Sequence, residues 1–403
     1  MRGKPSFLAV DFFCGAGGTT NGLIAAGGYV FAGVDKEGEC RRTFVENNLN
    51  PDGTNPAYLQ RDIFKKTDDY PDGEQDILVE EIKALHSPLR SRYPGVPLLF
   101  SICAPCQPFT NMSRNVGEER EEGRRRDRGL LGQSLDIIRR FMPELVLCEN
   151  VAGIQNKKYG GVWQSFMAEM EEDYLVGSAV VDAVNFGIPQ YRKRSILLAV
   201  RKDVASAATR EALDENGRLV VPEEDPDEPL RTVRETIGHL PPLEPGGVHP
   251  AIANHHCGKV KEVNRKRLAF IAPGGSNRDY IGTGLELACH VRLKEGAAGK
   301  QSGSGFSDSY TRLSGDRPAP TITTKCYSFT NGRYGHYDMS QQRALSVREA
   351  AALQSFPDSY EFHSKSLIRA ARMVGNAVPP KLGCFFGRKL STMYDSSAVS
   401  MAA

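Results

Sequence analysis

Short apolar runs alternate with amphipathic segments over about the first 200 residues of the chain. The runs are rich in β-branched and aromatic residues, as strands are, and the segments between them carry apolar residues at helical spacing. The expected strands are Phe7–Phe12, Tyr29–Val34, Pro97–Ile102, Leu145–Cys148, Val176–Val184 and Ser195–Val200, and the expected helices are Thr20–Ala26, Cys40–Asn47, Ile77–Leu85, Ser134–Phe141 and Val162–Glu171. This alternation is typical of βαβ units and predicts an α/β, doubly wound domain whose largely parallel sheet is covered on both faces.

The pattern ends near Lys202 and returns only toward the C-terminus. The intervening segment contains an acidic, proline-rich run at Val221–Leu230 and a basic stretch at Lys259–Arg267. Helical spacing is found again at Ser346–Gln354 and at Lys381–Leu390. We therefore expect a first domain over residues 1–201, an irregular second domain over 202–325, and a segment over 326–403 that returns to the first domain.

The composition is that of an ordinary globular protein. The 403 residues are 40% hydrophobic and 25% charged, which excludes a disordered, collagen-like or coiled-coil chain. Because 51 basic residues stand against 49 acidic ones, the net charge of +2 gives no bulk argument for a nucleic-acid partner, and any such charge must be local. Nine cysteines without a disulfide-like spacing suggest a reducing compartment.

The sequence shows no secretory or membrane address. The apolar run Ser6–Val10 is too short for a signal peptide. A long uncharged stretch that includes Tyr93–Phe109 contains four prolines, which prevent a membrane helix. We expect a soluble, cytoplasmic protein with no membrane partner.

A glycine-rich turn, Asp11–Gly18, follows the first expected strand and opens a helix. Its glycines allow a ligand to approach the backbone at the carboxyl edge of the sheet, and Asp35, at the end of the next strand, suits ribose hydroxyls. Thr20 stands where a dinucleotide fingerprint has Gly or Ala, so a plain βα turn is the alternative. Asp62, before Ile63, is either a ligand contact from a third strand or a helix cap.

Cys103-Ala-Pro-Cys106 has the spacing of a redox pair or of half a zinc site. A zinc site needs further ligands, and the cluster His255-His-Cys257 fits no standard spacing, so we expect no metal. A redox pair begins a helix, which Pro108 interrupts here. Cys103 is then a core residue on a strand, and Cys106 is a lone thiol, inert or nucleophilic, on a proline-stiffened loop.

Three further clusters carry polar groups that chemistry could use. They are Glu149-Asn-Val151 after the fourth strand, Gln190-x-Arg-x-Arg194 leading into the sixth, and a tight loop over Gly375–Pro380 before the last helix. In the second cluster Gln190, Arg192 and Arg194 alternate with period two and so point the same way. Taken singly, the clusters are a strand-end carboxylate, a solvated basic strand and a helix start.

In their order along the chain, these motifs resemble those of the DNA (cytosine-5)-methyltransferases. The matching motifs are the Asp11–Gly18 turn, Asp35, Asp62-Ile63, Pro105-Cys-Gln107, Glu149-Asn-Val151, Gln190-x-Arg-x-Arg194, the helix Ser346–Gln354 with Phe356-Pro357, and Gly375-Asn376. They cover nearly the whole chain apart from the middle segment. Ala104 departs from the family, which more often has a second proline there, but this residue has no chemical role.

The resemblance implies a Rossmann-like class I methyltransferase sheet, S-adenosyl-L-methionine as cofactor, and a set of catalytic residues. In the family's chemistry a thiolate adds to carbon 6 of cytosine and makes carbon 5 nucleophilic. By resemblance Cys106 is this thiolate, Glu149 shares a proton with ring N3, Arg192 holds the base and the carboxyl group in register, and Arg194 supports the site. The implied cofactor residues are Phe13, Gly15, Ala16, Gly17, Gly18, Asp35, Lys36, Asp62, Ile63, Pro105 and Asn376.

The resemblance also implies double-stranded DNA as the partner, with the target base flipped out of the helix. The family has a DNA-contacting loop where residues 117–129 lie, and it places target recognition in the irregular segment 202–325. The expected DNA contacts are Gln107, Arg124, Arg125, Arg126, Lys259, Lys261, Arg265, Lys266 and Arg267, with the loop Gln301–Gly305 in the major groove. A charge run such as 124–126 is otherwise a solvated surface. We expect a monomer at the nucleoid, with a cognate restriction endonuclease as a possible partner.

Three other functions fit parts of the sequence. The same chemistry on tRNA cytosine is the nearest alternative, although the middle segment is longer than a stem-recognising enzyme needs. A catalytically silent DNA-binding relative would not need Cys106, Glu149 and Arg192 intact. An NAD-dependent oxidoreductase would bind nicotinamide, but it leaves the Pro-Cys-Gln, Glu-Asn-Val and Gln-x-Arg-x-Arg motifs unexplained.

Overall fold

The computed structural model describes residues 3–105, 126–127, 129–156, 159, 161–288, 290 and 309–399. The chain divides into two compact units. Unit 1 consists of Met1–Phe186, Lys193–Asp227 and Val378–Ala403, and unit 2 consists of Gly187–Arg192 and Glu228–Ala377. Each unit therefore combines segments that are far apart in the sequence.

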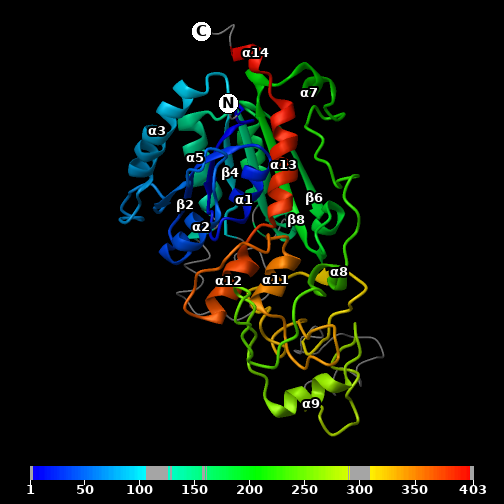
Figure 1. Ribbon diagram of the computed structural model, residues 1–403. Helices are drawn as coiled ribbons and strands as arrows, with labels where there is room; N and C mark the ends of the chain where they lie inside the picture. Colours follow the sequence, from blue (N-terminus) through cyan, green and yellow to red (C-terminus); the bar gives the residue numbers. More distant parts are fainter. Residues whose placement is uncertain are drawn as a thin grey trace. The chain divides into compact units, whose positions relative to one another are not determined.

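Unit 1 is built on a seven-stranded sheet. In spatial order its strands are β3 (Ala57–Gln60), β2 (Tyr29–Asp35), β1 (Leu8–Phe12), β4 (Leu98–Ile102), β5 (Leu145–Val151), β8 (Lys193–Arg201) and β6 (Tyr174–Asp182). Strand β8 runs antiparallel to β5 and β6, and the other neighbouring pairs are parallel (Figure 1). The predicted α/β fold with a largely parallel sheet is confirmed.

The central strands are buried along their whole length, as parallel strands between two helical layers must be. All five residues of β1 and all five of β4 are buried. Phe12 of β1 is in register with Ile102 of β4, which is in register with Cys148 of β5. The segments that follow these strands therefore leave the sheet at one edge, the carboxyl edge where ligands bind in such folds.

Helices cover the sheet of unit 1. They are α1 (Gly18–Ala25), α2 (Arg41–Asn47), α3 (Gln75–Arg92), α5 (Leu130–Phe141), α6 (Val162–Met170), α7 (Ala207–Glu211), α13 (Pro380–Met393) and α14 (Ser396–Val399), with 3₁₀ turns η1 (Gly38–Cys40), η3 (Ala152–Gln155), η5 (Ala183–Phe186) and η6 (Lys202–Val204). Leu78 of α3, Leu135 of α5 and Trp163 of α6 share a hydrophobic core with Val10 of β1, so these helices cover the face to which Val10 points. Helix α13 packs beside α1 and contacts β5 and β8 (Figure 1).

The predicted strands and helices of unit 1 are present, with shifted ends. The helix expected over Ile77–Leu85 is α3, which continues through Pro88 to Arg92. The edge strand β3 is not predicted from the pattern, because it has four residues, of which only Tyr58 is buried. Glu149-Asn-Val151, expected to follow a strand, belongs to β5 itself.

Unit 2 has few regular elements. Among the described residues they are β7 (Gln190–Tyr191), α8 (Val233–Ile237), α9 (Glu262–Phe270), β9 (Ala319–Pro320), α11 (Val347–Leu353) and α12 (Leu367–Asn376). The loop predicted over Gly375–Pro380 is wrong at its start, because Gly375 and Asn376 complete α12. The buried residues of α12 include the small residues Ala370, Ala371 and Gly375.

A buried arginine organises the loops of unit 2. Leu268, Ile271, Tyr280, Phe329 and Ala344 form a small hydrophobic core. The Arg312 side chain beside it is buried and donates hydrogen bonds to the carbonyls of Leu268, Ile271, His336 and Asp338. Burial lowers the pKa of Arg312 to about 10. A buried cation is costly without hydrogen-bond partners, and the four carbonyls supply them. The same bonds connect loops that have no regular hydrogen-bond ladder.

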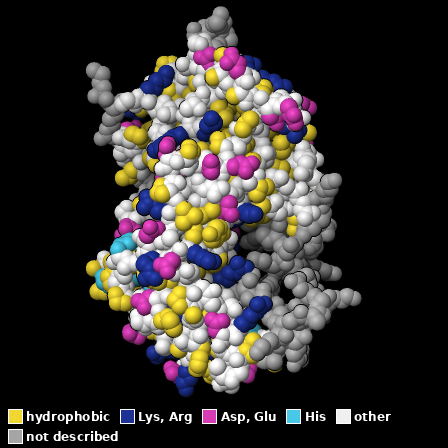
Figure 2. Space-filling model, turned by 90° about the vertical axis from the view of Figure 1, so that its right-hand side faces the viewer, with side chains coloured by type: hydrophobic (Ala, Val, Ile, Leu, Met, Phe, Trp, Pro, Cys, Tyr) yellow, Lys and Arg dark blue, Asp and Glu magenta, His cyan; other side chains and the backbone are white. Residues whose placement is uncertain are grey.

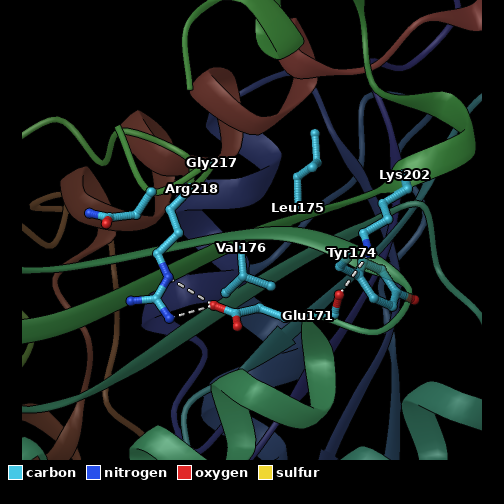
Figure 3. Close-up of a pocket in the computed structure, with 8 residues that line it drawn as sticks. Glu171, Tyr174, Leu175, Val176, Lys202, Gly217 and Arg218 are labelled. Atoms are coloured by element: carbon cyan, nitrogen blue, oxygen red, sulfur yellow. Dashed lines mark hydrogen bonds and ion pairs between the residues drawn. The ribbon is translucent and has the colours of Figure 1, made fainter. Parts of the chain in front are cut away.

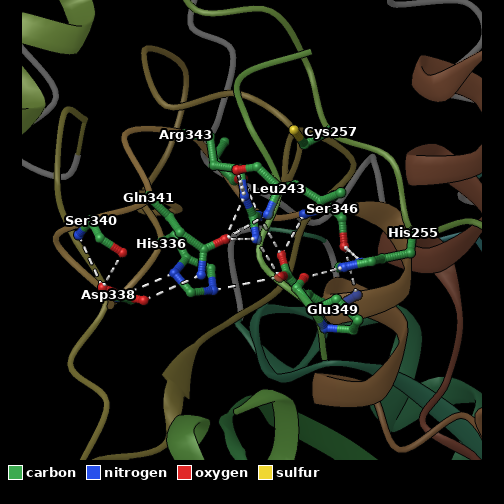
Figure 4. A network of polar contacts seen from close by, with 12 residues as sticks. Leu243, His255, Cys257, His336, Asp338, Ser340, Gln341, Arg343, Ser346 and Glu349 are labelled. Atoms are coloured by element: carbon green, nitrogen blue, oxygen red, sulfur yellow. Dashed lines mark hydrogen bonds and ion pairs between the residues drawn. The ribbon is translucent and has the colours of Figure 1, made fainter. Parts of the chain in front are cut away.

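A second buried network fixes the start of α11 (Figure 4). Ser346 and Glu349 form a capping box, in which each side chain accepts a hydrogen bond from the other residue's backbone N–H. Arg343 donates to both oxygens of the Glu349 carboxylate at 2.7 Å. Burial raises the pKa of Glu349, but hydrogen bonds from Arg343 and His336 outweigh it and hold the pKa well below its usual range. His255 bonds Ser346 and a backbone carbonyl through its two ring nitrogens.

Acidic and basic side chains are interspersed on the surface drawn in Figure 2. This mixture agrees with the net charge of +2. Within the described ranges, no helix combines the length and the apolar character needed to cross a membrane.

Candidate active site

The glycine-rich turn between β1 and α1 has positive φ angles at alternate residues. Phe13, Gly15 and Gly17 have φ values of 59°, 49° and 87°. A bulky residue such as Phe13 rarely adopts this conformation, and such strain clusters at ligand sites. A Cβ added to Gly15 would meet no atom within 4 Å, so the backbone there faces open space. The predicted residues Ala16 and Gly18 complete the turn, and α1 begins at Gly18.

Asp35 lies at the end of β2 and is tied to this turn. Its Oδ2 accepts a hydrogen bond from the Gly15 N–H at 2.9 Å, and its Oδ1 accepts one from the Glu37 N–H at 2.9 Å. Burial raises the pKa of Asp35, and the two backbone hydrogen bonds oppose the increase. Lys36, the next residue, is exposed. The structure thus brings together Gly15 and Asp35, two residues that the sequence assigns to the cofactor.

Asp62 and Ile63 follow the edge strand β3. Ile63 is buried in the core of unit 1. Asp62 Oδ1 accepts a hydrogen bond from the Phe64 N–H at 3.1 Å, which forms a local turn. Helix α3 begins later, at Gln75, so Asp62 does not cap it and the helix-cap alternative is wrong.

Cys103 comes directly after β4 and packs against α1. Its Sγ lies 3.6 Å from Thr19 Oγ1 and 3.8 Å from Ser101 Oγ. Burial and the nearby carboxylates of Glu149 and Asp11 raise the pKa of this thiol. Cys103 is only partly buried and lies one residue beyond the end of β4, so it is not the core residue on a strand that the sequence predicts.

The chain that leads to the predicted nucleophile is held by Asn150. The Asn150 Nδ2 donates a hydrogen bond to the Ala104 carbonyl at 3.1 Å. This bond links the Glu-Asn-Val motif to the residue before Pro105, which is partly buried. Cys106 and Gln107 lie outside the described residues.

Glu149 points from β5 toward the neighbouring strand β8. Arg194 Nε lies 2.7 Å from Glu149 Oε1, and the two side chains are 10% and 11% exposed. A buried charge needs such a partner, because an unpaired carboxylate would be strongly destabilised. Arg194 therefore orients the carboxyl group that the sequence assigns to catalysis.

Side-chain burial alternates with period two over residues 190–194, as predicted, but these residues do not form one strand. Gln190, Arg192 and Arg194 are buried, whereas Tyr191 is 47% exposed. The strand is interrupted, since β7 pairs with β9 in unit 2 and Lys193 begins β8 in unit 1. The three side chains therefore do not belong to one continuous strand as predicted.

Arg192 and Gln190 join distant segments within unit 2. Arg192 donates hydrogen bonds to the carbonyls of Ile322, Gly375 and Ala377 at 2.9, 3.3 and 3.1 Å. Gln190 Oε1 accepts a hydrogen bond from the Ile322 N–H at 2.7 Å. Two motifs that the sequence placed in one site thus contact each other here.

The end of α12 carries the last predicted cofactor residue. Asn376 is exposed. The preceding Gly375 is packed so closely that an added Cβ would lie 2.3 Å from the Thr323 carbonyl carbon. Glycine is required at this position because the neighbouring atoms belong to the backbone.

The predicted DNA contacts of unit 2 separate into exposed and buried residues. Lys259, Lys261 and Lys266 are exposed around α9. Arg265 is partly buried, with its Nη1 3.6 Å from Glu262 Oε2. Arg267 is buried and donates to the Leu285 carbonyl at 2.6 Å, which gives it a packing role in this structure. Arg124, Arg125 and the loop Gln301–Gly305 lie outside the described residues.

Sequence reasoning missed the contact between Asp11 and Thr20. Thr20 Oγ1 donates a hydrogen bond to Asp11 Oδ2 at 2.7 Å, and both residues are fully buried. This bond crosses from α1 to β1 directly beneath the turn. The departure of Thr20 from the dinucleotide fingerprint could have suggested a polar partner in the strand.

Arg126 was predicted to contact DNA, and the structure places it beside a predicted cofactor residue. Its guanidinium hydrogen-bonds Asp62 Oδ2. The guanidinium carbon also lies 4.9 Å from the ring centre of Phe64 and 5.6 Å from that of Tyr70. No local signal in the sequence links residues 62 and 126.

A pocket of about 380 Å³ lies elsewhere in unit 1 (Figure 3). Its lining residues are Glu171, Tyr174, Leu175, Val176, Lys202, Asn216, Gly217 and Arg218. Arg218 pairs with the Glu171 carboxylate at 2.8 Å, and Lys202 donates to the Glu171 carbonyl at 2.8 Å. The pocket borders the start of β6, so it lies at the edge of the sheet opposite the candidate active site.

The sheet of unit 1, with one antiparallel strand between β5 and β6, defines a class I methyltransferase fold. A solved DNA modification methyltransferase encoded within an Escherichia coli prophage has the same fold, with a TM-score of 0.63 and 19% sequence identity. The match covers 96% of this chain and 99% of that one.

The sequence comparisons identify the family within this class. Residues 91–392 match the C-5 cytosine-specific DNA methylase family. The type II methylase M.HgiDII of Herpetosiphon aurantiacus is 31% identical over 93% of this chain and 92% of its own. The type II methyltransferase M1.HphI of Haemophilus parahaemolyticus is 28% identical over 94% and 84%. The chain therefore belongs to the C-5 cytosine-specific DNA methylase family and is a DNA (cytosine-5)-methyltransferase, which confirms the resemblance seen in its motifs.

Proposed function

We propose that the protein transfers a methyl group from S-adenosyl-L-methionine to carbon 5 of cytosine within a specific duplex DNA sequence, through a covalent Cys106 adduct on a flipped base. The observation that carries this proposal is the 31% identity to a type II methylase over 93% of the chain, which includes the middle segment. Family membership implies cytosine methylation with this cofactor, and the ordered motifs supply the residues.

The glycine-rich turn and its surroundings fit this cofactor. The open space above Gly15 leaves room for a ligand against the backbone, and Asp35 offers carboxylate oxygens for ribose hydroxyls. Asp62 offers an acceptor for the amino group of adenine. The remaining contacts are proposed for Phe13, Ala16, Gly17, Gly18, Lys36, Ile63, Pro105 and Asn376. When bound, the cofactor supplies an electrophilic methyl group on a sulfonium centre.

The Cys106 thiolate starts the reaction by adding to carbon 6 of the base. A carbon–sulfur bond forms, and the electron pair of the 5,6 double bond moves toward carbon 5 and ring N3. Carbon 5, made nucleophilic by this addition, would then attack the methyl group that the bound cofactor supplies, and the rest of the cofactor would leave as a neutral thioether. A base removes the carbon-5 proton, and the released electron pair restores the double bond and expels the thiolate.

Glu149 and the two arginines support the addition step. Glu149 shares a proton with ring N3 as negative charge develops there. The ion pair with Arg194 fixes the direction of this carboxyl group. Arg192, held by three carbonyls, keeps the base and the carboxyl group in register.

DNA recognition is proposed for the middle segment and for the residues after the nucleophile. We assign target recognition to 202–325, flanked by the domain over 1–201 and the segment over 326–403. Gln107, Arg124 and Arg125, with Lys259, Lys261, Arg265 and Lys266, are the proposed contacts. The type II names of the relatives support a restriction–modification context, in which a cognate restriction endonuclease is a possible partner. We further propose a monomeric enzyme at the nucleoid.

Labelled methyl transfer to duplex DNA and to tRNA tests the substrate. We expect label in DNA alone, and label only in tRNA would establish the alternative, a tRNA cytosine-5 methyltransferase. Sequencing of DNA from cells that express the protein, with base-resolution detection of methylcytosine, then gives the target sequence.

Replacement of the thiol tests the mechanism. Cys106→Ser should lose most turnover while it keeps cofactor binding, because serine is a much weaker nucleophile at neutral pH. The unmodified enzyme should form a covalent adduct with a duplex that contains 5-fluorocytosine. A near-normal rate for Cys106→Ser would remove Cys106 from this role.

A further inference from the structure

We propose that Arg126 is a positioning residue for cofactor binding, which orients the Asp62 carboxylate toward the adenine side of the cofactor pocket. This inference rests on the proposed assignment of Asp62 to adenine. It gives Arg126 a different role from the neighbouring Arg124 and Arg125, which the sequence groups with it as DNA contacts.

The guanidinium of Arg126 is held by two kinds of contact. It hydrogen-bonds Asp62 Oδ2, and it lies over the rings of Phe64 and Tyr70. These two rings pack against each other, with centres 4.3 Å apart. A flat guanidinium over an aromatic face gains a cation–π attraction that fixes its plane as well as its position.

Both oxygens of the Asp62 carboxylate are thereby restrained. Oδ1 accepts the Phe64 N–H at 3.1 Å, and Oδ2 accepts the Arg126 hydrogen bond. A carboxylate offers about four acceptor positions, so two remain for a ligand after these two donors. A fixed carboxylate plane presents the remaining positions in fixed directions, which lowers the ordering cost when a donor such as the adenine amino group binds.

The surrounding packing keeps Arg126 and Asp62 together. The Arg126 carbonyl accepts a hydrogen bond from the N–H of Gly129, the N-cap residue of α5, at 2.9 Å, which ties Arg126 to the segment just before this helix. Within α5, the Gln133 side chain accepts a hydrogen bond from the Lys65 N–H at 2.9 Å. The buried Gln75 donates to the Ile63 carbonyl at 3.1 Å and to the Gln133 carbonyl at 3.3 Å. The segment over 62–65 is therefore bound to the segment over 126–133 at several points.

A role in phosphate binding makes a different prediction for the same residue. A lysine or arginine that contacts a phosphate releases counterions, so its loss lowers the salt dependence of DNA binding. A positioning role at Asp62 changes cofactor affinity in the absence of DNA. The two roles are thus separated by two binding measurements on the same variant.

The experiment measures binding of S-adenosylhomocysteine to the full-length enzyme without DNA, by titration calorimetry. Arg126→Ala should raise the Kd roughly five-fold, about the net contribution of one ordinary hydrogen bond, because Arg126 acts on the cofactor only through Asp62. Arg126→Lys should recover only part of the affinity, since an ammonium keeps the charge but lacks the planar fork. The KM for the cofactor should rise with little change in kcat.

Arg140→Ala is the matched control. Arg140 lies on α5 and pairs with an aspartate of α3 rather than with Asp62, with its Nη1 2.6 Å from Asp76 Oδ1. Its removal should leave the Kd unchanged. If both variants raise the Kd, each in proportion to its decrease in the unfolding temperature, Arg126 has a purely structural role and the proposal is overturned.

The Asp62→Asn variant tests separately whether Asp62 binds adenine and whether Arg126 orients Asp62. In the Asp62→Asn background, Arg126→Ala should have no further effect on the Kd, because the two residues act as one unit. If Asp62→Asn itself leaves the Kd unchanged, the assignment of Asp62 to adenine fails, and the inference fails with it. If Asp62→Asn weakens binding while Arg126→Ala only reduces the salt dependence of DNA binding, Arg126 is a phosphate contact and the assignment of Asp62 stands.

Discussion

Asp11 is a carboxylic acid enclosed in the central strand of unit 1. It is fully buried, and within the described part of the chain its Oδ1 has no hydrogen-bond partner. Burial raises the pKa of Asp11 to about 6, although hydrogen bonds from Thr20 and Ser101 act in the opposite direction. A buried ionisable group so close to the glycine-rich turn makes the stability of this region sensitive to pH.

Replacement of Asp11 by asparagine should expose this sensitivity. The folded protein holds the Asp11 proton more tightly than the unfolded chain, so the group's favourable contribution is complete below about pH 4 and is lost as the pH rises through about 6. Asp11→Asn does not titrate. Its free energy of unfolding relative to the unmodified protein should therefore increase between pH 4 and pH 7, by up to about 3 kcal/mol. Urea titrations at several pH values measure the difference in the free energy of unfolding between the two proteins. If this difference does not change with pH, the pKa of Asp11 is not raised in the folded protein.

The pairing of Asp11 with Thr20, and of Asp62 with Arg126, marks the limit of sequence reasoning at the level of single residues. Asp35 and Glu149 were found because strand ends meet at one edge of a parallel sheet, whereas Asp62 was assigned through the resemblance to the family's motifs. A hydrogen bond between residues 62 and 126 depends instead on how α5 packs, which no local pattern encodes. The exposure of a charged residue is similarly set by tertiary packing, as the buried Arg267 illustrates.

At the scale of elements, α1 and α13 form a contact between opposite ends of the chain. A Cβ added to Gly22 of α1 would lie 2.2 Å from the Pro380 carbonyl oxygen and 2.7 Å from the Cys384 nitrogen. Both neighbouring atoms belong to the backbone of α13, so they cannot move aside as a flexible side chain would. Glycine at this position lets the two helices approach closely.

Gly22→Ala should therefore destabilise the protein by about 1–3 kcal/mol, the usual cost of overpacking a closed interface. The matched control is Gly132→Ala on α5, where an added Cβ would meet no atom within 4 Å. Alanine is a better helix former than glycine by about 1 kcal/mol, so Gly132→Ala should be neutral or stabilising. Thermal unfolding of both variants provides the measurement, and equal midpoints would show that the α1–α13 contact can relax without cost.

The strength of the apolar pattern explains which elements could be predicted. Strands β1, β4 and β5 are mostly apolar and buried and were recognised, whereas β3 has a single buried residue and was not. Helix α3 was predicted too short, since Pro88 suggests an end although it falls near the last turn. Unit 2 shows little periodicity because hydrogen bonds from side chains such as Arg312 and Gln190 replace regular ladders.

At the scale of the whole molecule, the net charge is close to zero although the proposed substrate, DNA, is a polyanion. The net charge is +2, and both signs of charge are interspersed on the surface that Figure 2 shows. Long-range attraction to a polyanion is then weak, and the electrostatic part of binding comes from a few local cations. Lys259, Lys261 and Lys266 are exposed, and none of them has an ion pair among the described contacts.

If these lysines contact phosphates, each adds a fixed amount to the salt dependence of the DNA-binding constant. The logarithm of the binding constant falls linearly with the logarithm of salt concentration, with a slope of about 0.9 for each neutralised phosphate. Lys266→Ala should therefore reduce the slope by about 0.9 for cognate and unrelated duplexes alike. Lys83→Ala is the control, because Lys83 is exposed on α3 and paired with Glu80 at 2.8 Å. Fluorescence anisotropy with labelled duplexes over a range of salt concentrations gives both slopes, and an unchanged slope for Lys266→Ala would remove this lysine from the DNA surface.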